Sequence, residues 1–170
     1  MKKVCIDASI AVAWLSYDIF SESANNLWKE WSKEGVELLA PPIFPAEVMS
    51  ILRQQVISKK ILPEEGEEAF SIYMDIPVRI VDGFKMYRAA WQLVKDLNLP
   101  ACYDTQYLAV AELEDCEYWT LDMKLMNLIQ GEYNRVKWVG NHGIPIKEVK
   151  KTLKDNDITK NDIPGLWREI

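Results

Sequence analysis

The chain has 170 residues, of which 49% are apolar, so it is long enough for one domain with a sizeable core. Its 20 basic and 26 acidic residues give a net charge of -6, which excludes a protein that coats nucleic acid through general positive charge. Three cysteines and one histidine form no zinc or disulfide pattern. The start of the chain lacks the apolar stretch of a secretory signal, and no apolar run is long enough to span a membrane. We therefore expect a cytoplasmic protein without membrane segments.

Apolar runs and helical periodicities alternate along most of the chain. Short apolar runs predict strands at residues 3–7, 36–40, 78–81, 117–121 and 136–139. Helical spacing and helix start signals predict helices at residues 8–15, 21–34, 45–59, 63–74, 84–97, 103–113 and 122–129. Strands that alternate with helices favour an α/β fold with a parallel sheet and helices on both faces.

The compact pattern ends near Gly140, which predicts one domain at residues 1–140 and a C-terminal extension at 141–170. Within the extension, apolar residues from Ile146 to Leu153 have the spacing of one short helix. Near the end of the chain, Leu166, Trp167 and Ile170 are apolar residues in an otherwise polar tail. The extension is either a frayed terminus or a segment that docks on another surface.

Four acidic residues stand where a predicted strand stops or a predicted helix begins. They are Asp7, Glu47, Asp104 and Asp122. A charge beside apolar runs costs desolvation energy unless something stabilises it. In an open α/β sheet, strand ends and helix starts meet in one crevice, where four carboxylates would repel one another. A Mg²⁺ or Mn²⁺ ion would relieve that repulsion, because hard cations take oxygen ligands.

Such an ion can activate a water molecule and hold the oxygens of a phosphate during an in-line displacement. This chemistry needs no histidine, which suits a chain whose one histidine, His142, lies in a turn-like context. Each acid also has a simpler interpretation. Asp7, Asp104 and Asp122 can each cap the helix that follows, and Glu47 can match the helix dipole in a first turn. The site hypothesis depends on all four standing at equivalent positions.

The order and context of these acids resemble the PIN domain, and most closely the VapC-like toxins of toxin–antitoxin pairs. The resemblance covers residues 1 to about 140, and its most specific part is the segment that begins at Tyr103. The matching segments are Ile6-Asp7-Ala8-Ser9, Pro45-Ala46-Glu47-Val48, Tyr103-Asp104-Thr105-Gln106-Tyr107-Leu108-Ala109-Val110-Ala111-Glu112 and Thr120-Leu121-Asp122-Met123-Lys124-Leu125.

The resemblance implies a three-layer α/β/α sandwich around a parallel sheet and a ribonuclease that depends on Mg²⁺ or Mn²⁺. It implies direct metal ligation by Asp7, Asp104 and Asp122, with Glu47 acting through water. It places Ser9 and Thr120 at positions whose hydroxyls orient the carboxylates by hydrogen bonds. It also implies a homodimer that a small antitoxin inhibits by inserting a segment into the acidic pocket. Where the family often has a small residue after the third acid, this chain has Thr105, which bears on the shape of the pocket.

Two other functions are compatible with parts of the sequence. A catalytically silent PIN-like protein-interaction module would account for Trp167 and for Thr105. A phosphatase that uses Asp7 as a covalent nucleophile would usually have a second aspartate two residues later, and this chain has Ser9 there.

Few other side chains are expected at the site. Lys124 is the one basic residue that we expect near it, since Arg53 falls roughly 120° around the helix from Glu47. The tryptophans with helical spacing are expected to be core or dimer contacts rather than base-stacking platforms: Trp14, Trp28, Trp31 and Trp91.

Overall fold

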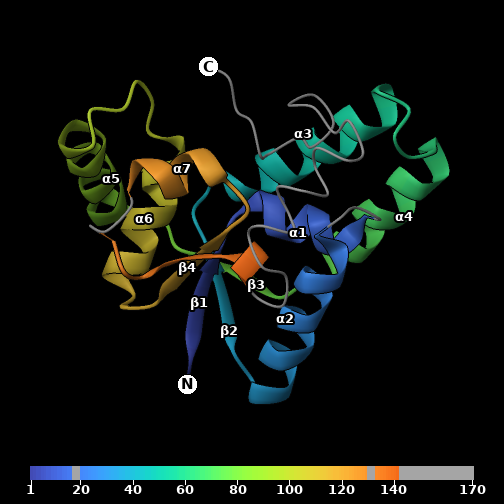
Figure 1. Ribbon diagram of the computed structural model, residues 1–170, viewed down its shortest axis with the longest axis horizontal. Coiled ribbons are helices and arrows are strands. Elements are labelled where there is room, and N and C mark those ends of the chain that lie inside the picture. Colours follow the sequence, from blue (N-terminus) through green and yellow to red (C-terminus); the bar gives the residue numbers. More distant parts are fainter. Residues whose placement is uncertain (17–19, 130–132, 142–170) are drawn as a thin grey trace.

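The computed structural model describes residues 1–16, 20–129 and 133–141, so the expectations for the C-terminal extension fall outside the described residues. The described strands form one sheet: β1 (Lys3–Ile6), β2 (Glu37–Ala40), β3 (Val78–Ile80), β4 (Glu117–Thr120) and β5 (Val136–Trp138). Every pairing is parallel, and the strand order is β3-β2-β1-β4-β5 (Figure 1). Because the order reverses at β1, the carboxyl ends of β1 and β4 adjoin the crevice where such sheets bind ligands.

The helices cover both faces of this sheet and confirm the predicted three-layer arrangement. They are α1 (Ala8–Leu15), α2 (Ser21–Glu34), α3 (Phe44–Ile57), α4 (Pro63–Met74), α5 (Phe84–Asp96), α6 (Tyr103–Leu113), α7 (Met123–Leu128) and the 3-10 helix η1 (Val139–Asn141). Helices α1 to α4 lie on one side of the sheet and α5 and α6 on the other (Figure 1). The largest difference from the predicted bounds is at α3, which ends at Ile57 rather than at Lys59.

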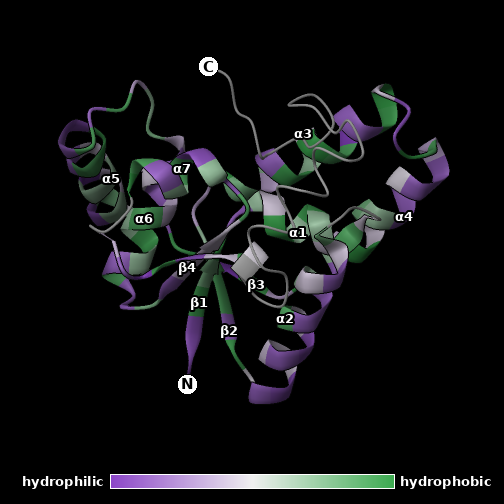
Figure 2. Cartoon of the chain, viewed as in Figure 1, coloured by the Kyte–Doolittle hydropathy of each residue, from purple (hydrophilic) through white to green (hydrophobic). Residues whose placement is uncertain are grey.

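Apolar side chains of the strands and of the inward helix faces form the core. Val4, Cys5 and Ile6 of β1 are each at most 1% exposed, as expected for a central strand covered on both faces. Figure 2 shows hydrophobic residues on the strands and hydrophilic residues on the outer helix surfaces. Cys5 and Cys116 are buried and unpaired, and burial raises the pKa of each thiol, so they pack as small apolar residues.

The tryptophans follow the expectation in part. Trp31 is buried and meets Trp119 edge to face, while Trp14 and Trp28 stack at the α1–α2 contact with ring centroids 4.1 Å apart. Trp91 is 61% exposed on α5, which excludes a core position and leaves a dimer contact as a prediction. None of the helices in the described ranges is both long enough and apolar enough to cross a membrane.

Candidate acidic site

Asp7 follows β1 directly and caps α1 with one of its two carboxylate oxygens. Its Oδ1 accepts hydrogen bonds from the backbone N–H groups of Ser9, at 3.0 Å, and Ile10, at 3.2 Å, and from the Ser9 hydroxyl. The residue is 5% exposed, and these donors offset the desolvation of its charge. Helix capping therefore accounts for Oδ1 and leaves Oδ2 to other contacts.

The second oxygen of Asp7 is held by hydroxyl groups from β4. Asp7 Oδ2 accepts hydrogen bonds from Thr120 Oγ1 at 2.5 Å and from the Tyr118 hydroxyl at 3.3 Å. Residues 118 and 120 point to the same side of β4 because side chains alternate along a strand. Thr120 and Tyr118 are both fully buried, so this end of the sheet encloses Asp7 with oriented donors.

Asp122 is tied to the same hydroxyl and caps the next helix. Its backbone N–H donates to Thr120 Oγ1 at 2.8 Å, and its Oδ1 accepts from the N–H groups of Lys124, at 2.7 Å, and Leu125, at 3.0 Å. The capping interpretation is thus confirmed for one oxygen of Asp122, as it is for Asp7. The Thr120 hydroxyl joins the two acids at the ends of β1 and β4.

Glu47 and Asp104 lie in the first turns of α3 and α6. Glu47 Oε2 accepts a hydrogen bond from the Tyr107 hydroxyl at 2.5 Å. The interpretation of Asp104 as a helix cap is wrong, because α6 begins at Tyr103 and its N-cap is Cys102, which caps through no side chain. Asp104 is instead inside the first turn of α6, one residue after the helix begins.

The Tyr118 hydroxyl indicates where Asp104 lies. Burial raises the pKa of Tyr118 well above its ordinary value, and the negative charges of Asp7 and Asp104 raise it further. Both carboxylates are thus close enough to act on one phenol, which stays protonated and able to donate. Tyr118 also stacks on Tyr107, the partner of Glu47, so contacts connect Asp7, Asp122 and Glu47, and the charge of Asp104 acts on the same phenol.

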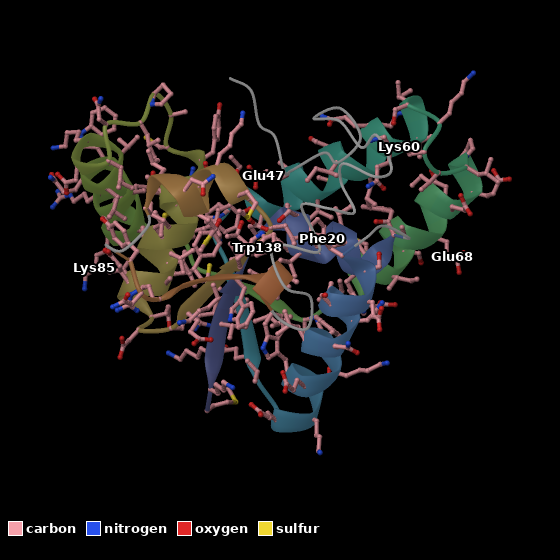
Figure 3. All side chains as sticks on the ribbon, viewed as in Figure 1. Phe20, Glu47, Lys60, Glu68, Lys85 and Trp138 are labelled. Carbon is pink, nitrogen blue, oxygen red and sulfur yellow. The ribbon has the colours of Figure 1, made fainter. Side chains whose placement is uncertain are left out.

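The basic residues considered for RNA contact differ in how near they lie to these acids. Lys124 follows Asp122 within α7, whereas Arg53 lines a cavity of about 220 Å³ between α3 and α4. Figure 3 shows Glu47 at the end of α3 near the middle of the molecule, with Lys60 beyond the other end of that helix. Lys60 therefore lies at the end of α3 that is remote from Glu47.

The donors have the chemistry that Mg²⁺ and Mn²⁺ prefer, since they are carboxylate and hydroxyl oxygens. In residues 1–16, 20–129 and 133–141, no group of three or more histidine, cysteine, aspartate and glutamate side chains is arranged to hold a metal ion. The fit to a divalent cation consequently rests on the type of donor and on the contacts that link the acids.

Two tyrosines at this site were missed by the sequence reasoning. Tyr107 lies three residues after Asp104, which places both on one face of α6. Tyr118 lies two residues before Thr120, which places both on one face of β4. These spacings were available in the sequence, but nothing in it shows that the tyrosines meet.

The sheet is all-parallel, and Asp7 and Asp122 follow the carboxyl ends of the adjacent strands β1 and β4. This arrangement is that of open α/β proteins, which bind ligands where the strand order reverses. Residues 4–128 match the PIN domain family, and the chain belongs to that family. No curated protein matches the chain.

Solved structures show the same fold. VapBC2 from Rickettsia felis, bound to a DNA fragment from their promoter, is 16% identical with a TM-score of 0.57, covering 80% of this chain and 96% of that one. A toxin–antitoxin complex from Klebsiella pneumoniae is 15% identical with a TM-score of 0.57, covering 79% and 95%. VapC20 of Mycobacterium tuberculosis, a sarcin–ricin loop cleaving toxin, is 14% identical with a TM-score of 0.56, covering 78% and 98%.

Proposed function

We propose that this chain is an endoribonuclease that depends on Mg²⁺ or Mn²⁺ and serves as the toxin of a toxin–antitoxin pair. The observation that carries the proposal is the bonded path from Asp7 through Thr120 to Asp122 at the ends of two adjacent parallel strands. Asp104 acts on the same buried phenol as Asp7, so acids from separate elements face one region. Membership of the PIN domain family supports the assignment.

In this proposal Asp7, Asp104 and Asp122 are the direct metal ligands, and Glu47 acts through water. When bound, the ion would activate a water molecule and stabilise charge on the oxygens of an RNA phosphodiester. Ser9 and Thr120 hold the Asp7 carboxylate in one orientation through their hydroxyl groups. No protein nucleophile is required, because water is the attacking group.

RNA would approach an acidic protein, so its phosphates need local positive charge at the site. Lys124 is the residue that we assign to this contact, because it lies in the first turn of the helix that Asp122 caps. We place the nuclease domain at residues 1–140, with 141–170 as an extension, and we propose that the protein is cytoplasmic.

A small antitoxin protein is the proposed inhibitor, and its segment would enter the acidic pocket. Exposed apolar side chains on and between α3 and α4 are the residues that we propose as contacts for a protein partner. They are Met49, Ile57, Leu62, Phe70, Ile72 and Met74. The same observation favours the second candidate function, a catalytically silent PIN-like interaction module. The homodimer is a further prediction, and light scattering of the purified chain tests it.

Titration calorimetry with Mn²⁺ separates the two candidates. The nuclease should bind Mn²⁺ and cleave RNA, and EDTA should stop the cleavage while addition of excess Mn²⁺ restores it. The silent module should show neither heat of Mn²⁺ binding nor cleavage. The experiment uses the full 170-residue chain without its partner, because an antitoxin segment would compete for the acidic pocket.

A further inference from the structure

Two fully buried tyrosines stack on each other within the acidic site. Tyr107 comes from α6 and Tyr118 from β4, and each is 0% exposed. Their ring centroids are 5.6 Å apart, and the ring planes differ by 8°. Buried rings packed in this way have little freedom to rotate, so their hydroxyl groups are fixed relative to each other. We refer to Tyr107 and Tyr118 as the tyrosine pair.

Each hydroxyl of the tyrosine pair donates to a different acid. Tyr107 donates to Glu47 Oε2 at 2.5 Å, across 60 residues of sequence, and Tyr118 donates to Asp7 Oδ2 at 3.3 Å, across 111 residues. Glu47 lies in α3, on the α1–α4 side of the sheet, and Asp7 directly follows β1. Tyr107 lies in α6, on the opposite face of the sheet. The tyrosine pair therefore connects the two helical layers through the acids.

Phenylalanine would fill the same space without the need to satisfy a buried hydroxyl. A buried hydroxyl is unfavourable unless it is hydrogen-bonded, so the distinctive contribution of each tyrosine is its bond to a carboxylate. Residues that hydrogen-bond to metal ligands orient those ligands and tune their affinity for the ion. Of the two acids bonded to the tyrosine pair, Glu47 should depend more on its tyrosine, because Asp7 also accepts hydrogen bonds from Ser9 and Thr120.

We propose that Tyr107 and Tyr118 are positioning residues that hold Glu47 and Asp7 in the orientations required for metal binding. This inference rests on the proposed function. Neither tyrosine needs to touch the ion or the RNA. Stacking of the two rings fixes the distance between their hydroxyl groups. The hydrogen bonds from these hydroxyls then fix the positions of the Glu47 and Asp7 carboxylates.

The test is the Mn²⁺ affinity of Tyr107→Phe and Tyr118→Phe, measured by calorimetry on the folded full-length chain. Loss of a group that orients a ligand typically weakens metal binding by about 10- to 100-fold, and we expect Tyr107→Phe to fall in this range. Tyr118→Phe should have the smaller effect, because Asp7 keeps its bonds from Ser9 and Thr120. Tyr73→Phe is the matched control. The half-buried Tyr73 ring packs beside Phe44 and Phe70. The Mn²⁺ affinity of this variant should stay within about twofold of wild type.

A double-mutant cycle with Glu47→Ala distinguishes positioning from general packing. If Tyr107 acts through Glu47, then Tyr107→Phe should change the Mn²⁺ affinity by less than about twofold in the Glu47→Ala background. A purely structural role would give the same loss in both backgrounds and would overturn the inference. Wild-type affinity in both single variants would also overturn it. Absence of Mn²⁺ binding by the wild-type chain would reject the proposed function itself, and with it this inference.

Discussion

Thr120 donates its hydroxyl hydrogen to Asp7 Oδ2 at 2.5 Å, although the two residues are 113 positions apart in the chain. The contact arises because β1 and β4 are parallel neighbours, with Ile6 in register with Trp119. Residues that follow the two strands must then lie side by side. The same hydroxyl accepts the Asp122 N–H, so a single buried side chain fixes the relation between two of the four acids.

Replacement of Thr120 by valine should destabilise the protein by about 1–3 kcal/mol, because the buried Asp122 N–H loses its acceptor and Asp7 loses a donor. Thr120→Ser is the matched control, since it keeps the hydroxyl and removes only a methyl group. Urea denaturation of both variants measures the free energy of unfolding. Greater destabilisation by serine than by valine would show that packing, not the hydrogen bonds, determines the role of this residue.

Replacement of Thr105 by valine should have the opposite effect. The Thr105 hydroxyl is fully buried and has no hydrogen-bond partner among the described residues, so it carries a desolvation cost without compensation. Thr105→Val removes that cost at nearly constant volume and should raise the free energy of unfolding by about 1 kcal/mol. A lower midpoint of urea unfolding for Thr105→Val than for wild type would contradict this explanation.

The contact between α3 and α4 gives a test of the fold that is separate from the acids. A Cβ at Gly66 would lie 2.5 Å from Val56 Cγ2, so Gly66→Ala should destabilise the protein by about 1 kcal/mol despite the better helix propensity of alanine. In a Val56→Ala background the clash is gone, and Gly66→Ala should then be stabilising. Thermal unfolding of the four proteins in this cycle measures the coupling. Equal effects of Gly66→Ala in both backgrounds would contradict the packing.

Acid should weaken an ion-pair network at the edge of the sheet away from the acids. Arg79 and Lys3 hydrogen-bond to Glu114 and lower the pKa of its carboxyl from 4.5 to about 2. A carboxyl with a lowered pKa in the folded state contributes stability above pH 4.5, and this contribution is lost as the pH falls from 4.5 towards 2. Because Arg79 is partly exposed, we expect about 1 kcal/mol.

Glu114→Gln provides the comparison for this network. The variant should be less stable than wild type at pH 7, and the difference should shrink as the pH falls below 4.5. Urea unfolding at a series of pH values measures it, and added salt should reduce the difference at pH 7. A difference between the two proteins that is constant from pH 7 to pH 2.5 would contradict the assignment.

Much of the fold could be predicted because the local signals were strong. Gly35, with φ of 65°, ends α2 in the left-handed conformation expected of a C-terminal glycine, and Pro45 lies in the first turn of α3. The buried strands were recognisable as short apolar runs. The bounds of α6 were predicted as the structure has them, at residues 103–113, and this start at Tyr103 already places Asp104 inside the helix rather than at its cap.

The residues alone predicted the candidate site as a set of four acids, and the family resemblance added the hydroxyls of Ser9 and Thr120, which both bond to Asp7. Alternation of strands and helices places Asp7 and Asp122 at strand ends, and this needs no knowledge of the strand order. The bonds of Tyr107 to Glu47 and of Tyr118 to Asp7 depend on how two helical layers meet across the sheet. A sequence pattern describes one element at a time, so contacts that join three elements could not be derived from it.

The central claim is that the acids form one metal site for RNA cleavage, and Asp104→Asn tests it most directly. The substitution keeps the shape of the side chain and removes its charge. We expect the variant to remain folded by circular dichroism, to lose Mn²⁺-dependent cleavage of RNA and to bind Mn²⁺ at least about 10-fold more weakly. Asp96→Asn, an exposed position on α5, is the control and should cleave as wild type does. Cleavage by Asp104→Asn at the wild-type rate in Mn²⁺ would contradict the account.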